Sequence, residues 1–301
     1  MAFRLLTCLL LLGASASAGI VDDVREALTQ NNFAAAESEL KTYQGQRGIT
    51  SEYLEALSWM GRAALGMQQY TQAETYAKRT QALAIAQLKG RALDADENLP
   101  LALGAAFEVQ AQALAARGQK TQGIALLRSA LRTYGNTSIA ARLHKNLNLL
   151  TFVGLPAPAL RSVEHLGASP ASLAQLKGSP SLLFFWAHWC GDCKGEAPIL
   201  QRLRSEFKGL TMVAPTRRYG YAAHGEDTTP KAELAYINRV WQQYYAGLQG
   251  VSVPVSKENF NVYGASTTPT LVLIDRTGKI AFYHPGALSY EELRAAIEKV
   301  M

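Results

Sequence analysis

The spacing of apolar residues divides the chain into two halves of different character. Over residues 21–150 apolar side chains recur every three or four positions, as in Val21, Val24 and Leu28. This spacing places an apolar stripe along one side of a helix. The same stretch is rich in Ala, Leu, Gln and Arg and contains a single proline, Pro100. We therefore expect an all-α domain over residues 19–150, followed by a second domain over residues 151–301.

Small residues within the helical half stand at positions that suggest paired helices. Gly61 lies twelve positions before Ala73, and small residues also stand near the start of other expected helices, at Ala36 and Gly123. This spacing resembles that of tetratricopeptide repeats, in which small residues let the two helices of a pair approach closely. Because the separations are irregular, a generic helical bundle remains an open alternative. Stacked repeats would present a concave binding surface, whereas a compact bundle need not.

A buried strand followed directly by a helix is predicted around a pair of cysteines. Residues 181–186 form an apolar and aromatic run typical of a strand buried on both faces, and helical spacing begins at Cys193. Cys190 and Cys193 are therefore expected where the helix starts. Unpaired N–H groups and the helix dipole stabilise a thiolate there. Cys190 is thus the candidate nucleophile, and Cys193, one turn further in, is expected to resolve the mixed disulfide.

Several motifs resemble those of the thioredoxin fold. The run FFWAHWCGDCK is similar to its active-site signature, Pro198 to the proline of its active-site helix, and Thr268-Pro269 to its cis-proline loop. Residues 154–158, 173–178 and 274–280 resemble the exported TlpA and ResA branch of the family. The resemblance implies an α/β thioredoxin-like domain, with a central mixed sheet flanked by helices, preceded here by an all-α helical-repeat-like domain.

The resemblance also assigns roles to further residues near the cysteines. It implies that Glu196 is a buried proton acceptor for Cys193, where a reading from the sequence alone would make it an exposed helical acid. Substrates are expected to contact the rim of the site, formed by Trp189, Gly191, Asp192, Thr268 and Pro269. Of the aromatic residues at positions 184, 185, 186 and 189, only Trp189 is expected to be exposed. His188 is expected at the rim of the site.

Two features depart from the family pattern. The residues between the cysteines are Gly191-Asp192, where a proline is commoner, and this leaves the redox potential open. A long polar insert over residues 214–231 is expected on the loop side of the sheet near the cysteines. It leaves the identity of the substrate open.

The first residues read as an export signal. Residues 1–18 contain a basic start at Arg4, an apolar run and a small-residue cleavage site at residues 16–18. The apolar run is too short for a stable membrane anchor, because a spanning helix needs about 20 residues. We therefore expect a secreted, periplasmic protein in which Cys8 is removed with the signal. In such an oxidising compartment, a lone pair of cysteines in so short a turn is more often catalytic than structural.

Charge and metal-ligand spacing exclude other classes of function. The formal net charge is +6, but the Lys and Arg residues are scattered, so no nucleic-acid partner is expected. His188 and His224 with the two cysteines do not match a known zinc spacing, so we expect no metal. No cofactor is expected either.

The pattern as a whole predicts an exported thiol-disulfide oxidoreductase. It would exchange a Cys190-Cys193 disulfide with the disulfides or dithiols of partner proteins, acting as a reductant, while the helical domain binds protein. The upstream redox partner is not identified by the sequence. One alternative is a helical protein-binding module with a redox-inactive thioredoxin-like domain. Another is a peroxiredoxin-like peroxidase, which is disfavoured because Ala187 stands where that class places a Thr or Ser to bind peroxide.

Overall fold

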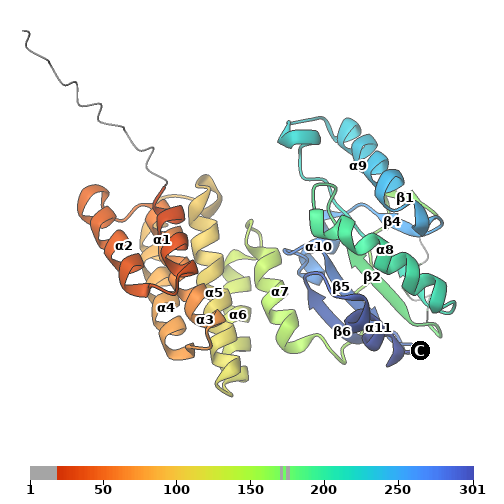
Figure 1. Cartoon of the computed structure of the whole chain (residues 1–301), viewed down its shortest axis with the longest axis horizontal. Coiled ribbons are helices and arrows are strands. Elements are labelled where there is room, and N and C mark those ends of the chain that lie inside the picture. Colours follow the sequence, from red (N-terminus) through yellow and green to blue (C-terminus); the bar gives the residue numbers. More distant parts are fainter. Residues whose placement is uncertain (1–18, 170–171, 174–176) are drawn as a thin grey trace, which may run out of the picture.

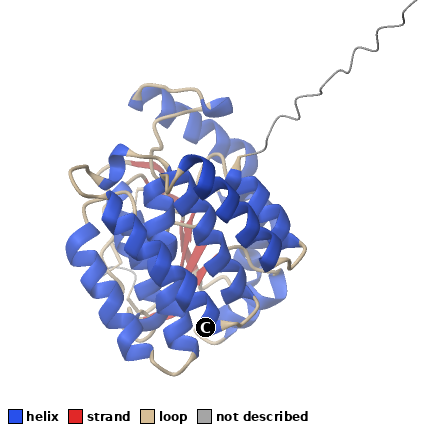
Figure 2. Ribbon diagram, turned by 90° about the vertical axis from the view of Figure 1, so that its left-hand side faces the viewer, coloured by secondary structure: helices blue, strands red, loops and turns tan. Residues whose placement is uncertain are grey.

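The protein consists of a helical part and an α/β part joined by one helix. The structure, a computed structural model, describes residues 19–169, 172–173 and 177–301. Figure 1 shows the helices of the N-terminal half packed together on one side and the strands gathered on the other. Seen from the helical side (Figure 2), the strands lie behind the N-terminal helices. The predicted export signal over residues 1–18 lies outside the described residues, and the predicted turn over residues 173–178 lies partly outside them.

The N-terminal part is helical, as the apolar spacing predicted. Small residues allow close contact between successive helices. A Cβ atom added to Gly61 would lie 3.5 Å from the carbonyl oxygen of Ala73, and one added to Gly123 would lie 2.9 Å from that of Ala111. The assignment of these pairs to a repeat family stays a prediction. The described elements are α1 (Ile20–Thr29), α2 (Phe33–Arg47), α3 (Ser51–Gly66), α4 (Tyr70–Gln87), η1 (Leu93–Ala95), α5 (Asn98–Ala116), α6 (Lys120–Tyr134) and α7 (Ala140–Thr151).

Helix α5 is the central helix of this part. It packs against α3, α4 and α6, and its buried residues are mostly Ala and Leu. Among the described helices it alone is long and apolar enough to cross a membrane by length and composition, and about two thirds of that window is buried inside the protein. Burial among its neighbours accounts for its apolar composition.

The C-terminal part is built on a mixed sheet of six described strands, as expected from the family resemblance. The strand order is β1-β4-β3-β2-β5-β6, in which β2 pairs in parallel with β3 and antiparallel with β5. The strands are β1 (His165–Gly167), β2 (Ser181–Phe185), β3 (Thr211–Val213), β4 (Ser252–Pro254), β5 (Thr270–Ile274) and β6 (Ile280–Pro285). The helical elements are α8 (Gly191–Glu206), η2 (Ala223–Gly225), α9 (Pro230–Tyr244), η3 (Ala246–Leu248), α10 (Lys257–Tyr263) and α11 (Tyr290–Glu298).

Helices cover both faces of this sheet. Every residue of β2 and β5 is buried, as expected for central strands. Leu182 and Phe184 share one apolar core with residues of α8, α9 and α11, whereas Leu183 and Phe185 share another with residues of α10. Because side chains alternate along β2, the strand contributes residues to both cores. This packing holds the carboxyl end of β2 in place, and the cysteines follow directly after it.

Helix α7 belongs to both parts of the molecule. It packs against α6 on one side and α10 on the other. Phe152, directly after α7, packs edge-on against Tyr263 and Tyr283, with ring centroids 5.6 Å and 5.4 Å away. The Asn148 side chain also donates a hydrogen bond to the backbone carbonyl of Val262. The boundary that the sequence places after residue 150 thus falls in the last turn of a helix that holds the two parts together.

The contact between α7 and the α/β part requires a glycine. Gly264 ends α10 in the left-handed conformation, with φ of 64°. A Cβ atom at this position would lie 2.3 Å from the backbone nitrogen of Lys145 on α7. Only glycine satisfies both the backbone conformation and the close approach.

Candidate active site

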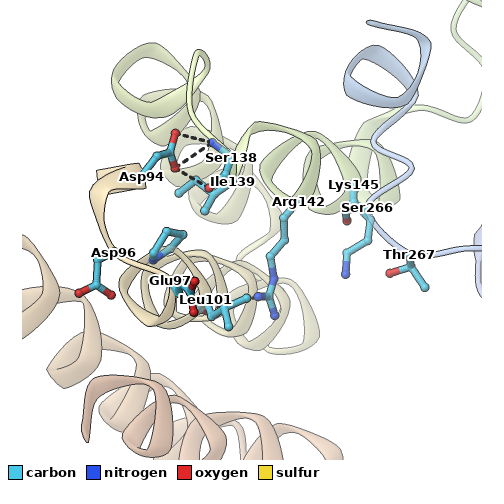
Figure 3. Close-up of a pocket in the computed structure, with 11 residues that line it drawn as sticks. Asp94, Asp96, Glu97, Leu101, Ser138, Ile139, Arg142, Lys145, Ser266 and Thr267 are labelled. Atoms are coloured by element: carbon cyan, nitrogen blue, oxygen red, sulfur yellow. Dashed lines mark hydrogen bonds between the residues drawn. The ribbon is translucent and has the colours of Figure 1, made fainter. Parts of the chain in front are cut away.

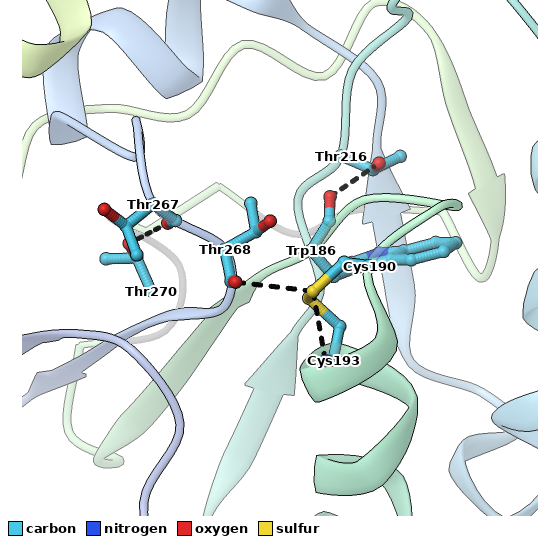
Figure 4. The surroundings of a disulfide bond; sticks show 7 residues. All are labelled: Trp186, Cys190, Cys193, Thr216, Thr267, Thr268 and Thr270. Atoms are coloured by element: carbon cyan, nitrogen blue, oxygen red, sulfur yellow. Dashed lines mark hydrogen bonds between the residues drawn. A yellow bond between two sulfur atoms is a disulfide. The ribbon is translucent and has the colours of Figure 1, made fainter. Parts of the chain in front are cut away.

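The two cysteines form a disulfide at the start of α8. Strand β2 ends at Phe185, and a tight turn follows, in which the Cys190 N–H donates to the carbonyl oxygen of Ala187. Cys190 is the N-cap residue of α8, and its sulfur is bonded to that of Cys193, with Cα atoms 5.3 Å apart (Figure 4). The strand, turn and helix predicted from the sequence are all present.

The sulfur of Cys190 lies in a setting that favours a thiolate. It accepts a hydrogen bond from the backbone N–H of Cys193 at 3.1 Å, so it occupies the place of an N-cap side chain. Such a donor and the positive end of the helix dipole stabilise negative charge on this sulfur once the disulfide is reduced. Cys193 is completely buried, and Cys190 is buried except for 3% of its surface. The difference in exposure is therefore small, and Cys190 is the more exposed of the two.

The loop before β5 closes the site from the opposite side. The peptide bond between Thr268 and Pro269 is cis, as the family resemblance implies. The carbonyl oxygen of Thr268 lies 3.3 Å from the Cys190 sulfur (Figure 4). The structure thus brings together Cys190 and Thr268-Pro269, which are almost 80 residues apart in the sequence.

The polar insert holds the active-site turn in place. The backbone N–H and the indole N–H of Trp186 donate to the carbonyl oxygens of Pro215 and Ala214, each at 3.1 Å. In return, the Thr216 hydroxyl donates to the Trp186 carbonyl at 2.9 Å (Figure 4). The insert therefore lies beside the cysteines, as expected, and is bonded to the residue that begins the active-site turn.

His188 is not at the rim, and the expectation from the sequence is wrong. Its side chain is completely buried, and its Nε2 atom lies 3.5 Å from the Glu233 carboxylate, which is also buried. Three tyrosine rings of the insert and α9 surround the imidazole edge-on at 5.3–5.5 Å: Tyr219, Tyr221 and Tyr236. Burial lowers the pKa of His188, and the Glu233 charge only partly offsets this. The imidazole is therefore uncharged at neutral pH.

Glu233 connects α9, the insert and the active-site turn. Its carboxylate accepts hydrogen bonds from the backbone N–H groups of Tyr219 and Gly220, in addition to its contact with His188. Charge-assisted bonds of this kind are about twice as strong as bonds between neutral groups. Sequence reasoning missed Glu233, because nothing in its local pattern distinguishes it from an exposed acid near the start of a helix.

The residues predicted at the rim lie around the disulfide. Trp189 is 49% exposed and packs against Tyr219 of the insert, whereas Phe184, Phe185 and Trp186 are buried, as expected. Gly191 and Asp192 are exposed at the start of α8. Pro269 is buried and Thr268 is half-buried, so of these two residues Thr268 is the more accessible to a substrate.

Glu196 is buried on α8, three positions after Cys193. Only 2% of its surface is exposed, so the exposed helical acid suggested by the sequence alone is excluded. Burial raises the pKa of its carboxyl group to about 7, and the nearby Asp192 charge adds to this effect. The Tyr245 hydroxyl is also buried, and both burial and the Glu196 charge raise its pKa. A carboxyl group that titrates near neutral pH can accept and return a proton.

The described residues offer no obvious metal site. Within residues 19–169, 172–173 and 177–301, no three His, Cys, Asp or Glu side chains gather as metal ligands would.

Comparison with known proteins identifies the family. Residues 171–301 match the family model of a thioredoxin-like domain. The thiol-disulfide oxidoreductase ResA of Bacillus thuringiensis is 26% identical over 150 residues, which cover 49% of this chain and 78% of ResA. The thiol:disulfide interchange protein DsbE of Tatumella citrea is 30% identical over 141 residues, which cover 46% of this chain and 68% of DsbE. The chain belongs to the thioredoxin-like thiol-disulfide oxidoreductases.

Solved structures of such proteins are also similar to part of this oxidoreductase. A thiol:disulfide interchange protein from Chlorobium tepidum aligns with a TM-score of 0.37 and 18% identity, covering 48% of this chain and 94% of that protein. Thiol-disulfide exchange requires a pair of cysteines that can form a disulfide, and Cys190 and Cys193 form one at the start of α8.

Proposed function

We propose that this oxidoreductase is an exported reductant of protein disulfides. In the reduced protein the Cys190 thiolate attacks one sulfur of a partner disulfide, forming a mixed disulfide and releasing the other partner sulfur as a thiolate. Cys193 then loses its proton and attacks the Cys190 sulfur. The partner leaves as a dithiol, and the enzyme is left with its disulfide.

One observation carries this assignment of roles. The Cys190 sulfur caps α8, accepts the N–H of Cys193 and touches the Thr268 carbonyl oxygen at the rim, whereas Cys193 lies one turn inside the helix. The position of Cys190 favours the thiolate and gives it access to a partner. Cys193 lies one turn further along α8, behind Cys190, and this position supports its role as the resolving cysteine.

Glu196 is proposed as the proton acceptor for Cys193. Its raised pKa keeps it partly protonated near pH 7, so it can take up and release a proton within the normal pH range. Asp192 and the ionised form of Glu196 both place negative charge near the cysteines. Negative charge disfavours the thiolate of the reduced state and thus makes the protein a stronger reductant. We expect a reduction potential closer to that of thioredoxin, about −270 mV, than to that of DsbA, about −120 mV.

The surface around the disulfide and the helical part are proposed to contact the partner. Trp189, Gly191, Asp192, Thr268 and Pro269 would line the contact with the substrate disulfide. The helical domain over residues 19–150 would raise the local concentration of partner proteins near Cys190. The export signal over residues 1–18 supports a secreted, periplasmic location, where protein disulfides form.

Single cysteine variants test the roles of the two sulfurs. Cys190→Ser should abolish the reduction of insulin disulfides, because no nucleophile remains at the rim. Cys193→Ser should still attack insulin and accumulate a mixed disulfide, which non-reducing electrophoresis and mass spectrometry detect. Equal yields of mixed disulfide from both variants, with both folded by circular dichroism, would refute the assignment.

A further inference from the structure

A cleft lies between the helical part and the α/β part and borders the loop that precedes Thr268. Its volume is about 630 Å³, and its walls come from three segments far apart in the sequence. The segments are the start of α5 with the residues before it, the start of α7, and the loop that carries Ser266 and Thr267. Thr267 directly precedes Thr268, whose carbonyl oxygen touches the Cys190 sulfur. One wall of the cleft is therefore the same loop that carries Thr268 at the rim of the redox site.

The end of the cleft nearest the redox site is basic. Figure 3 shows Arg142 and Lys145 extending from α7 near Ser266 and Thr267. Arg142 Nε lies 2.6 Å from a Glu108 oxygen, and Lys145 Nζ lies 3.2 Å from the same carboxylate. These two cations share one carboxylate, and their side chains keep 21% and 12% of their surface exposed.

A third cation adds to this imbalance of charge. Arg62 of α3 and Arg142 both donate to the Leu101 carbonyl oxygen, at 3.5 Å and 3.4 Å. Burial and the charge of Arg142 lower the pKa of Arg62 to about 10, yet it stays protonated at neutral pH. Three positive charges thus surround Glu108. Glu108, and Glu55 near Arg62, offset two of these charges, so an additional carboxylate from another molecule would find one unmatched positive charge at this end of the cleft.

The far end of the cleft is acidic, but two of its three carboxylates already have partners. Asp94 accepts hydrogen bonds from the backbone N–H and the hydroxyl of Ser138 (Figure 3). Asp96 caps the start of α5 by accepting from the N–H of Leu99, and it pairs with Arg91. These bonds hold Asp94 and Asp96 within the protein, whereas the third carboxylate, that of Glu97, is exposed.

We propose that this cleft binds the polypeptide segment next to the reacting cysteine of a substrate protein, and that its basic end selects an acidic side chain in that segment. The inference rests on the proposed function and names the feature by which a substrate is recognised. The Lys145 backbone lies against Gly264, four residues before Thr268. An extended chain covers about 3.4 Å per residue, so an Asp or Glu within about four residues of the substrate cysteine would reach Arg142 or Lys145.

The test compares two substrates that differ only in charge. Each is a disulfide-linked dimer of a short peptide with one cysteine, flanked within four residues by glutamates in one and by lysines in the other. The reduced full-length protein converts each dimer into two free peptides and becomes oxidised itself, and chromatography measures the rate. We expect the acidic dimer to react about fivefold faster at low salt, and the difference to shrink in 0.5 M salt as charges are screened.

Three variants make the test specific to the cleft. Arg142→Gln should bring the ratio of the two rates close to one. Glu108→Gln removes the carboxylate that Arg142 and Lys145 share and should therefore raise the ratio. Because the two variants should change the ratio in opposite directions, the test does not depend on one of them remaining folded. Arg132→Gln, an exposed position on α6 outside the cleft, makes the same change in net charge as Arg142→Gln and should leave the ratio unchanged.

Each outcome separates the inference from the proposed function. Equal rates for the two dimers, or faster reduction of the basic dimer, would overturn the role of the basic end while leaving disulfide reduction in place. An equal change of the ratio in Arg132→Gln and Arg142→Gln would assign the preference to overall charge and also overturn the inference. Failure of the folded protein to reduce either dimer would instead refute the proposed function.

Discussion

Replacement of Glu196 by glutamine should stabilise the protein increasingly as the pH rises above about 4.5, with the full effect above about pH 7. The pKa of this carboxyl group rises from its ordinary value of 4.5 to about 7 on folding. Between these two pH values the folded protein keeps a proton that the unfolded chain has lost. The free energy of unfolding therefore falls as the pH rises through this interval, and the loss is complete above about pH 7.

The size of the effect follows from the two pKa values. They differ by about 2.5, and each unit corresponds to about 1.4 kcal/mol, so the ionised Glu196 costs the folded state at most about 3.5 kcal/mol. Glutamine has nearly the same shape and no charge, so it avoids this cost. Glu196→Gln should therefore be up to about 3.5 kcal/mol more stable than the parent at pH 8, with almost no difference at pH 4.

Urea unfolding of the oxidised proteins at pH 4 and pH 8 measures the difference. The disulfide is kept intact, because reduction would add the titration of the cysteines. The fluorescence of Trp186 and Trp241, which are buried in the same core as residues of α8, follows the transition. Glu226→Gln, at an exposed loop position, is the matched control and should show no comparable dependence on pH. A Glu196→Gln effect of equal size at both pH values, or a loss of stability at pH 8, would refute the reasoning.

Three further expectations follow from the site and from the contact between the two parts. Glu196→Gln should change the pH profile of cysteine alkylation in the reduced protein, and an unchanged profile would remove its role in proton transfer. Glu233→Gln should weaken two charge-assisted hydrogen bonds to the insert, each worth about 1.5–3 kcal/mol, and limited proteolysis should then cut residues 214–231 faster than in the parent. Gly264→Ala should cost at least about 1–2 kcal/mol, because the left-handed backbone and the Lys145 backbone both oppose a Cβ atom; an unchanged urea midpoint would contradict this.

The redox centre could be predicted from the sequence because its main features are local. An apolar run, a short turn and a helical apolar spacing are enough to place Cys190 and Cys193 at the start of a helix. The same periodicity predicted the helical half and the buried aromatic residues of β2. The position of the cis-proline loop and the burial of Glu196 came from family resemblance, because no local pattern indicates either of them.

Only the tertiary structure decided the environment that surrounds this centre. His188 seemed by its position in the sequence to belong at the rim, but α9 brings Glu233 and the insert brings tyrosines to bury it. The cleft likewise joins residues near positions 94, 142 and 267, and the last of these comes near the others where α7 packs against α10, an approach that Gly264 permits. Such contacts depend on how distant segments fill space together, and the period of apolar residues within one segment carries no information about its neighbour. The sequence by itself therefore determined where the two cysteines lie on a strand, turn and helix, and the packing of the two parts determined which surfaces surround them.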